Sequence, residues 1–127
     1  MSKIAFVFPG QGSQSIGMAR DCFEQSELAR HIVLQANEVL QLELSDIMFN
    51  GPEQELKQTY NTQPALLTAS IAYLKLVEAA GIKADYVAGH SLGEYSALVA
   101  AGVISFEGAV QTVRKRGLIM ESAVPSG

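Results

Sequence analysis

The most constraining feature of this sequence is the segment at residues 89–93, GHSLG, called here the elbow. It ends a short predicted strand, Asp85 to Gly89, that carries no charge after Asp85, and it precedes an alanine-rich stretch that ends at Gly102. The pattern G-x-S-x-G in this position predicts a tight turn between a strand and a helix, because glycines let the two elements approach closely. A serine on such a turn stands clear of the sheet, where the helix dipole favours developing negative charge. Ser91 is therefore the candidate nucleophile.

A second predicted strand, the apolar run Ile4 to Phe8, leads into the glycine loop at residues 9–14, PGQGSQ. Both segments are short and largely apolar, which is typical of strands buried on both faces of a parallel sheet. Apolar spacing and end signals predict helices between and after them. The first predicted helix spans 27–41 and is capped by Ser26, and a short helix follows with Pro52 in its first turn. A third begins at Pro64 and ends at residue 80, and the last two span 93–101 and 105–123.

The order of strand, helices, strand, helix and helix predicts an α/β fold with a parallel sheet. Two strands make a poor sheet by themselves, so we expect the front part of a larger fold. A chain of 127 residues is long enough for one core and too short for two domains. A start at Met1 directly before the first strand favours a stand-alone enzyme over a domain of a synthase.

Composition excludes several classes of function. The net charge of −4 provides no basic field for nucleic acid. No stretch approaches the roughly 20 apolar residues that span a bilayer, and the first apolar run is too short for a signal peptide. Cys22 is the only cysteine, which fits a reducing compartment, so we expect a cytoplasmic protein. No spacing typical of metal ligands is present, and no cofactor is expected.

Neither histidine is a convincing base for Ser91. His90 is the neighbouring residue, and adjacent side chains in a turn diverge, so a supporting role behind the elbow fits it better. His31 flanks the apolar stripe of an early predicted helix and is typical of a partly exposed polar residue. We therefore expect the base to lie beyond Gly127.

A basic cluster at residues 114–116, RKR, lies on the last predicted helix. The apolar stripe of that helix directs Lys115 away from the core and places Arg114 and Arg116 about 80° to either side. The cluster is either a solvated basic face, or one arginine binds a substrate carboxylate as a bidentate pair. Periodicity does not choose between the two arginines.

Four segments are similar to the malonyl-CoA:acyl-carrier-protein transacylase family, which includes the acyltransferase domains of polyketide and fatty-acid synthases. They are 8–14 FPGQGSQ, 62–67 TQPALL, 89–94 GHSLGE and 116–120 RGLIM. The resemblance covers nearly the whole chain in the family's order. It implies that residues 1–127 are the N-terminal portion of one α/β-hydrolase-like acyltransferase domain. The catalytic histidine, its supporting residue and an inserted ferredoxin-like subdomain would lie beyond this stretch.

The resemblance also implies a role for each site residue. Ser91 would be acylated, the backbone N–H groups of Gln11 and Leu92 would form the oxyanion hole, and Arg116 would bind the malonyl carboxylate. The implied reaction is a ping-pong transfer of malonyl from malonyl-CoA to the pantetheine thiol of acyl carrier protein in fatty acid biosynthesis. The preference for malonyl over methylmalonyl and the oligomeric state are left open.

Three alternatives remain at this point. A serine esterase or thioesterase would share the elbow, and a polyketide-type acyltransferase would share all four segments. A truncated chain that folds only with its missing half would be no enzyme by itself. We expect the 127 residues alone to be a poor catalyst and to self-associate, since two apolar strands would leave faces or edges uncovered.

Overall fold

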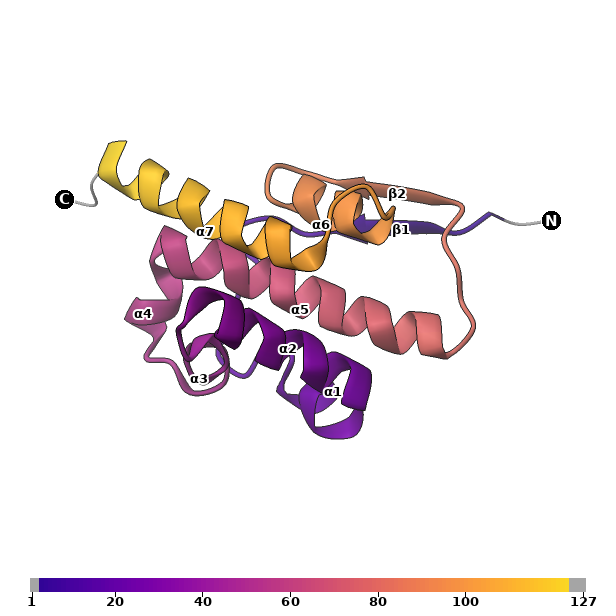
Figure 1. Ribbon diagram of the computed structural model, residues 1–127, viewed down its shortest axis with the longest axis horizontal. Coiled ribbons are helices and arrows are strands. Elements are labelled where there is room, and N and C mark those ends of the chain that lie inside the picture. The colour runs from indigo at the N-terminus through magenta and orange to yellow at the C-terminus, as the bar shows by residue number, and fades with distance from the viewer. Residues whose placement is uncertain (1–2, 124–127) are drawn as a thin grey trace.

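A parallel pair of strands lies beside a layer of helices in the computed structural model, which describes residues 3–123 (Figure 1). Strand β1 (Ala5–Phe8) pairs with strand β2 (Tyr86–Gly89), with Phe8 opposite Gly89. The carboxylate of Asp85 accepts a hydrogen bond from the backbone N–H of Ile4 at 2.7 Å and fixes this register at its start. The predicted α/β fold and the parallel pairing are confirmed.

Seven helices accompany the strands within the described residues. They are α1 (Arg20–Gln25), α2 (Glu27–Leu40), α3 (Leu44–Asn50), α4 (Glu53–Lys57), α5 (Thr59–Ala79), α6 (Gly93–Ala100) and α7 (Phe106–Ala123). Helix α5 runs between α2 and α7 and packs against both (Figure 1). Helices α1 and α3 are short and were not predicted. No helix of residues 3–123 is long and apolar enough to cross a membrane.

Two predicted helix starts are confirmed by their caps. The hydroxyl of Ser26 accepts a hydrogen bond from the N–H of Ala29 at 3.1 Å, which begins α2. The hydroxyl of Ser105 accepts one from the N–H of Gly108 at 3.0 Å, which begins α7. Each cap satisfies a backbone donor that the first helical turn leaves unpaired.

The predicted start at Pro64 is wrong, because α5 begins at Thr59 and contains Pro64. Proline has no N–H, so the carbonyl of Tyr60, four residues earlier, loses its helical partner. In the structure that carbonyl accepts a hydrogen bond from Nη1 of Arg114 on α7, at 2.9 Å. A side chain distant in sequence thus compensates for the missing bond, which local sequence signals do not reveal.

Within the described residues the two strands are not buried on both faces, and this agrees with the expectation that two strands by themselves leave apolar faces uncovered. Of the two strands only Phe8 is buried, whereas Val7 is 74% exposed and Tyr86 is 57% exposed. Helix α6 contacts both strands. An apolar run shows how much apolar surface a strand carries, but burial depends on neighbours that pack against both faces.

The predicted stripes of two helices are slightly displaced. The spacing of apolar residues predicts that Leu28 of α2 and Met120 of α7 are buried, but Leu28 is 55% exposed and Met120 is 41% exposed. The buried face of α2 instead includes Ala29 and Val33 together with Ile32. A helix that packs against neighbours on two sides buries a broader face than the narrow stripe used for prediction.

Candidate active site

The elbow forms the turn between β2 and α6, as predicted. Ser91 has a φ of 55°, which is rare for a residue with a Cβ, and its side chain is exposed. The N–H of Gly93 donates to the His90 carbonyl and that of Glu94 donates to the Ser91 carbonyl, each at 3.0 Å, so α6 begins directly behind the serine. A left-handed backbone costs about 1–2 kcal/mol, and strain of this kind concentrates at functional sites.

The two flanking glycines are required by close backbone contacts. A Cβ placed on Gly89 would overlap the backbone carbonyl of Gly93. A Cβ placed on Gly93 would overlap the carbonyl oxygen of Phe8 on β1. Because both obstacles are main-chain atoms, no side-chain rotation could make room. The glycines thus fix the sharpness of the turn that exposes Ser91.

The glycine loop packs against the backbone of the elbow. A Cβ on Gly10 would lie 2.8 Å from the carbonyl oxygen of His90 and 3.9 Å from the backbone nitrogen of Leu92. The loop that carries Gln11 therefore adjoins the turn that carries Ser91 and Leu92. Among residues 3–123, the N–H groups of Gln11 and Leu92 donate no hydrogen bond. Two backbone donors near the serine thus remain available to a ligand.

The glycine loop is held by its own contacts and by α5. The hydroxyl of Ser13 donates to the Gly10 carbonyl at 2.6 Å, and the N–H of Gly12 donates to Oε1 of Gln14 at 2.8 Å. The side-chain amide of Gln11 reaches Oγ1 of Thr59, at the start of α5, at 3.4 Å. The loop is therefore tied to α5 through the side chain of Gln11.

Neither histidine is in contact with the Ser91 hydroxyl within residues 3–123. The His90 ring is exposed and makes no hydrogen bond within residues 3–123, whereas its backbone carbonyl packs against Gly10. His31 is exposed on α2. No described contact joins either imidazole to the hydroxyl of Ser91.

The structure separates the two arginines that helical periodicity left equivalent. Nη1 of Arg114 donates to the Tyr60 carbonyl at 2.9 Å and to Oδ1 of Asn61 at 2.6 Å. Its guanidinium also lies 5.0 Å from the centroid of the Tyr60 ring. Burial lowers the pKa of Arg114 from its ordinary value. These contacts engage Arg114 in joining α7 to α5.

Arg116 lies instead against the elbow helix. Its guanidinium is 5.8 Å from the centroid of the Tyr95 ring on α6, one helical turn after Ser91. Its Nη1 donates to Oε1 of Gln63 on α5 at 2.9 Å. Gly117 permits this approach of the helices, because a Cβ there would lie 2.5 Å from the Cα of Tyr60. The structure thus places a cation beside the helix that follows Ser91.

Gln63 and Tyr95 were missed by sequence reasoning as site residues. Gln63 is 1% exposed although it is polar, and it lies in the conspicuous segment at 62–67. A buried polar side chain needs a partner, so the polar residues at positions 61–63, directly before the apolar run at 64–67, were the available signal. Nothing in the sequence indicated that Arg116 was that partner.

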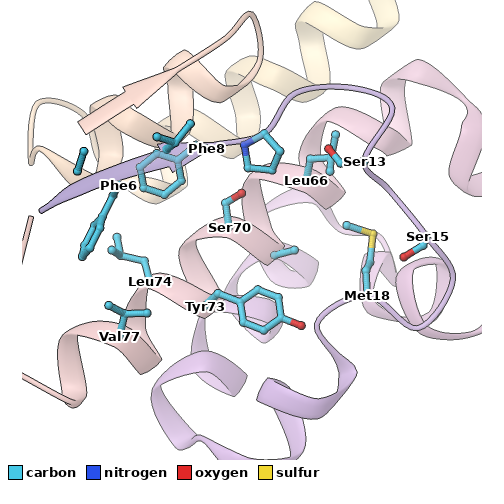
Figure 2. Close-up of a pocket in the computed structure, with 14 residues that line it drawn as sticks. Phe6, Phe8, Ser13, Ser15, Met18, Leu66, Ser70, Tyr73, Leu74 and Val77 are labelled. Carbon is cyan, nitrogen blue, oxygen red and sulfur yellow. The ribbon is translucent and has the colours of Figure 1, made fainter. Parts of the chain in front are cut away.

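A cavity of about 530 Å³ lies between β1, residues 9–18 and α5, and no residue of the elbow lines it (Figure 2). Figure 2 shows the Phe6 ring beside Leu74 of α5 and the Phe8 ring above it. Most of the residues that line the cavity are apolar. At its edge the Tyr73 hydroxyl donates to Oδ1 of Asp21 at 2.9 Å, and burial raises the pKa of Tyr73 to about 12. Neither Ser91 nor Arg116 lines this cavity.

Comparisons with known proteins show the family to which the chain belongs. Residues 5–127 match the family described as acyl transferase domain. The chain is 58% identical over 127 residues to the malonyl CoA-acyl carrier protein transacylase of Bacillus subtilis, covering all of this chain and 40% of that protein. It is 50% identical to the Staphylococcus aureus protein of that name, again over its whole length and over 41% of the relative.

Solved structures of similar proteins share the fold of this chain. The Coxiella burnetii malonyl CoA-acyl carrier protein transacylase matches with a TM-score of 0.95 and 48% identity, over 99% of this chain and 40% of that one. A malonyl-transacylase solved in complex with a type II polyketide acyl-carrier protein matches with a TM-score of 0.93 and 46% identity, over 99% and 41%. The chain spans about two fifths of the length of these relatives. It belongs to the acyl transferase domain family.

Proposed function

We propose that this chain forms the nucleophile-bearing part of a serine acyltransferase that moves malonyl from malonyl-CoA to the pantetheine thiol of acyl carrier protein in fatty acid biosynthesis. The observation that carries the proposal is the strained, exposed Ser91 at the start of α6, with Arg116 beside the same helix. The names of the relatives support the choice of donor and acceptor. We further propose that β1 and β2 belong to an α/β-hydrolase-like sheet, completed by an inserted ferredoxin-like subdomain and a C-terminal part.

The reaction proceeds in two transfers. The Ser91 hydroxyl oxygen attacks the malonyl thioester carbonyl, a carbon–oxygen bond forms, the carbon–sulfur bond breaks, and coenzyme A leaves as a thiol after receiving the serine proton. The sulfur of the pantetheine thiol then attacks the ester carbonyl, a carbon–sulfur bond forms, and the carbon–oxygen bond to Ser91 breaks. The thiol proton returns to the oxygen of Ser91, and the malonyl group remains on the pantetheine as a thioester. Since neither His90 nor His31 contacts Ser91 in the described residues, we assign the base to a residue outside this chain.

Two backbone N–H groups are proposed as the oxyanion hole, those of Gln11 and Leu92. The support is that the glycine loop packs on the elbow and that neither group has a partner within the described residues. Donors fixed in this way stabilise the tetrahedral intermediate of each transfer, and the loss of one such donor typically costs about 3 kcal/mol.

Arg116 is proposed to bind the malonyl carboxylate. Ion pairs within residues 3–123 join Lys57 to Glu53 and Lys75 to Glu78, so neither neutralises this guanidinium. Its contacts are with an amide and an aromatic ring, which leave its charge available. A planar guanidinium matches a carboxylate in a bidentate pair, and acetyl offers no such partner.

Substitution of Arg116 by alanine tests this function. The assay uses a hybrid protein in which this chain replaces the matching 127 residues of the Bacillus subtilis relative. The kcat/KM for malonyl-CoA should fall at least about tenfold while transfer of acetyl holds or rises, because only malonyl loses a charged partner.

Arg114→Ala in the same hybrid is the control. It should lower the free energy of unfolding and affect malonyl and acetyl transfer together, since Arg114 holds the Tyr60 carbonyl. A selectivity change in Arg114→Ala but not in Arg116→Ala would contradict the assignment.

A further inference from the structure

Helix α5 presents one buried amide to the cation of the site. Gln63 is 1% exposed, and its Oε1 accepts a hydrogen bond from Nη1 of Arg116 at 2.9 Å. Its Nε2 donates to the sulfur of Met120 at 3.2 Å. Arg116 and Met120 lie one turn apart on α7, so a single side chain of α5 contacts both.

The two contacts of Gln63 fix the orientation of its amide. A guanidinium only donates hydrogen bonds, and a thioether sulfur only accepts them. With Oε1 toward Arg116 and Nε2 toward Met120 both partners are satisfied, whereas the reverse orientation would place two donors against each other. The buried amide is thus locked, and the nitrogen of Arg116 that it binds is held with it.

An uncharged partner has a specific consequence for Arg116. A carboxylate at this position would form an ion pair with the guanidinium, and that pair would have to break before a substrate carboxylate could bind. The amide of Gln63 and the ring of Tyr95 restrain the guanidinium without neutralising its positive charge. A fixed cation loses less conformational entropy on binding than a mobile one.

We infer that Gln63 is a positioning residue, which aligns Arg116 for a substrate carboxylate while leaving its charge unneutralised. This inference rests on the proposed role of Arg116. Gln63 acts through the arginine and is assigned no contact with the reacting atoms. Its replacement should therefore change the selection between carboxylated and uncarboxylated acyl donors more than it changes acyl transfer in general.

The chain offers a matched control two residues away. Asn61 is 3% exposed, and its Oδ1 accepts a hydrogen bond from Arg114 at 2.6 Å, so it repeats the pairing of a buried amide with an arginine. Arg114, however, also binds the Tyr60 carbonyl and so serves the packing of α5 on α7. Asn61→Asp thus introduces the same chemical change without touching Arg116.

The test measures kcat and KM for malonyl-CoA and acetyl-CoA in the hybrid protein with Gln63→Glu, Gln63→Met and Asn61→Asp. Gln63→Glu should lower kcat/KM for malonyl-CoA at least about tenfold, mainly through KM, because the new carboxylate competes for Arg116. Gln63→Met keeps the side-chain volume but removes the amide oxygen that accepts from Arg116. It should lower kcat/KM for malonyl-CoA by a smaller factor. Acetyl transfer should stay within about twofold in both variants.

The outcomes separate this inference from the function on which it rests. Asn61→Asp should change kcat/KM for malonyl-CoA and for acetyl-CoA by the same factor. If Arg116→Ala alters the ratio of malonyl to acetyl transfer while both Gln63 variants lower the two activities equally, Gln63 is only structural and the inference is overturned. If Arg116→Ala leaves the ratio unchanged, the carboxylate-binding role fails and the inference falls with it. If Gln63→Glu does not fold, the ratio of malonyl to acetyl transfer in Gln63→Met tests the inference instead.

Discussion

Gly89→Ala in the hybrid protein is expected to lower the free energy of unfolding by about 3 kcal/mol or more, because its Cβ would overlap the Gly93 carbonyl. The strand and the helix would have to separate, which would displace the intervening turn and its serine. Acyl transfer should therefore be lost together with stability. Denaturant unfolding and a transfer assay on the same preparation measure both effects.

Gly108→Ala is the control for the general effect of adding a methyl group to a glycine. A Cβ there would meet only the side-chain oxygen of Ser105, at 3.1 Å, and Gly108 lies in the first turn of α7. Its effect should stay within about 1 kcal/mol. Equal destabilisation by Gly89→Ala and Gly108→Ala would show that the close backbone contact does not determine the elbow.

Ser91→Ala is expected to reduce malonyl transfer in the hybrid protein by a thousandfold or more, since it removes the hydroxyl oxygen that attacks the thioester. Stability should change little, because alanine keeps the same strained backbone. Ser91→Gly should be equally inactive but more stable by about 1 kcal/mol, since glycine adopts a φ of 55° without strain. Transfer assays and denaturant unfolding of both variants provide the measurements.

Two results would contradict that prediction. Transfer by Ser91→Ala within about tenfold of the unsubstituted hybrid would exclude Ser91 as the nucleophile. A Ser91→Gly variant less stable than Ser91→Ala would show that the left-handed φ of the elbow carries no strain. The first result concerns chemistry and the second concerns the fold, so they are read independently.

The sequence predicted the elements whose signals are local. Strand β2, the turn at Ser91 and helix α6 follow from a pattern of glycines and apolar residues within a short stretch. The starts of α2 and α7 follow from Ser26 and Ser105, because each caps a backbone donor a few residues away. In these places the stabilising contacts are made by residues close in sequence.

The features that sequence reasoning missed depend on contacts between distant residues. Pro64 lies inside α5 because Arg114, 50 residues later, binds the carbonyl that the proline leaves unpaired. Arg114 and Arg116 are equivalent by periodicity and differ only in their partners on α5 and α6. Resemblance to a family indicated Arg116, but its contact with Gln63 appears only once α5 and α7 are packed together.

The most direct test of the central claim is to locate the acyl group on the protein. The hybrid is incubated briefly with malonyl-CoA without an acceptor, and intact-mass analysis is followed by peptide mapping. We predict one malonyl adduct on the peptide that contains Ser91, its absence from Ser91→Ala, and its removal by a pantetheine thiol. An undiminished adduct in Ser91→Ala, or an adduct mapped to another residue, would contradict the account.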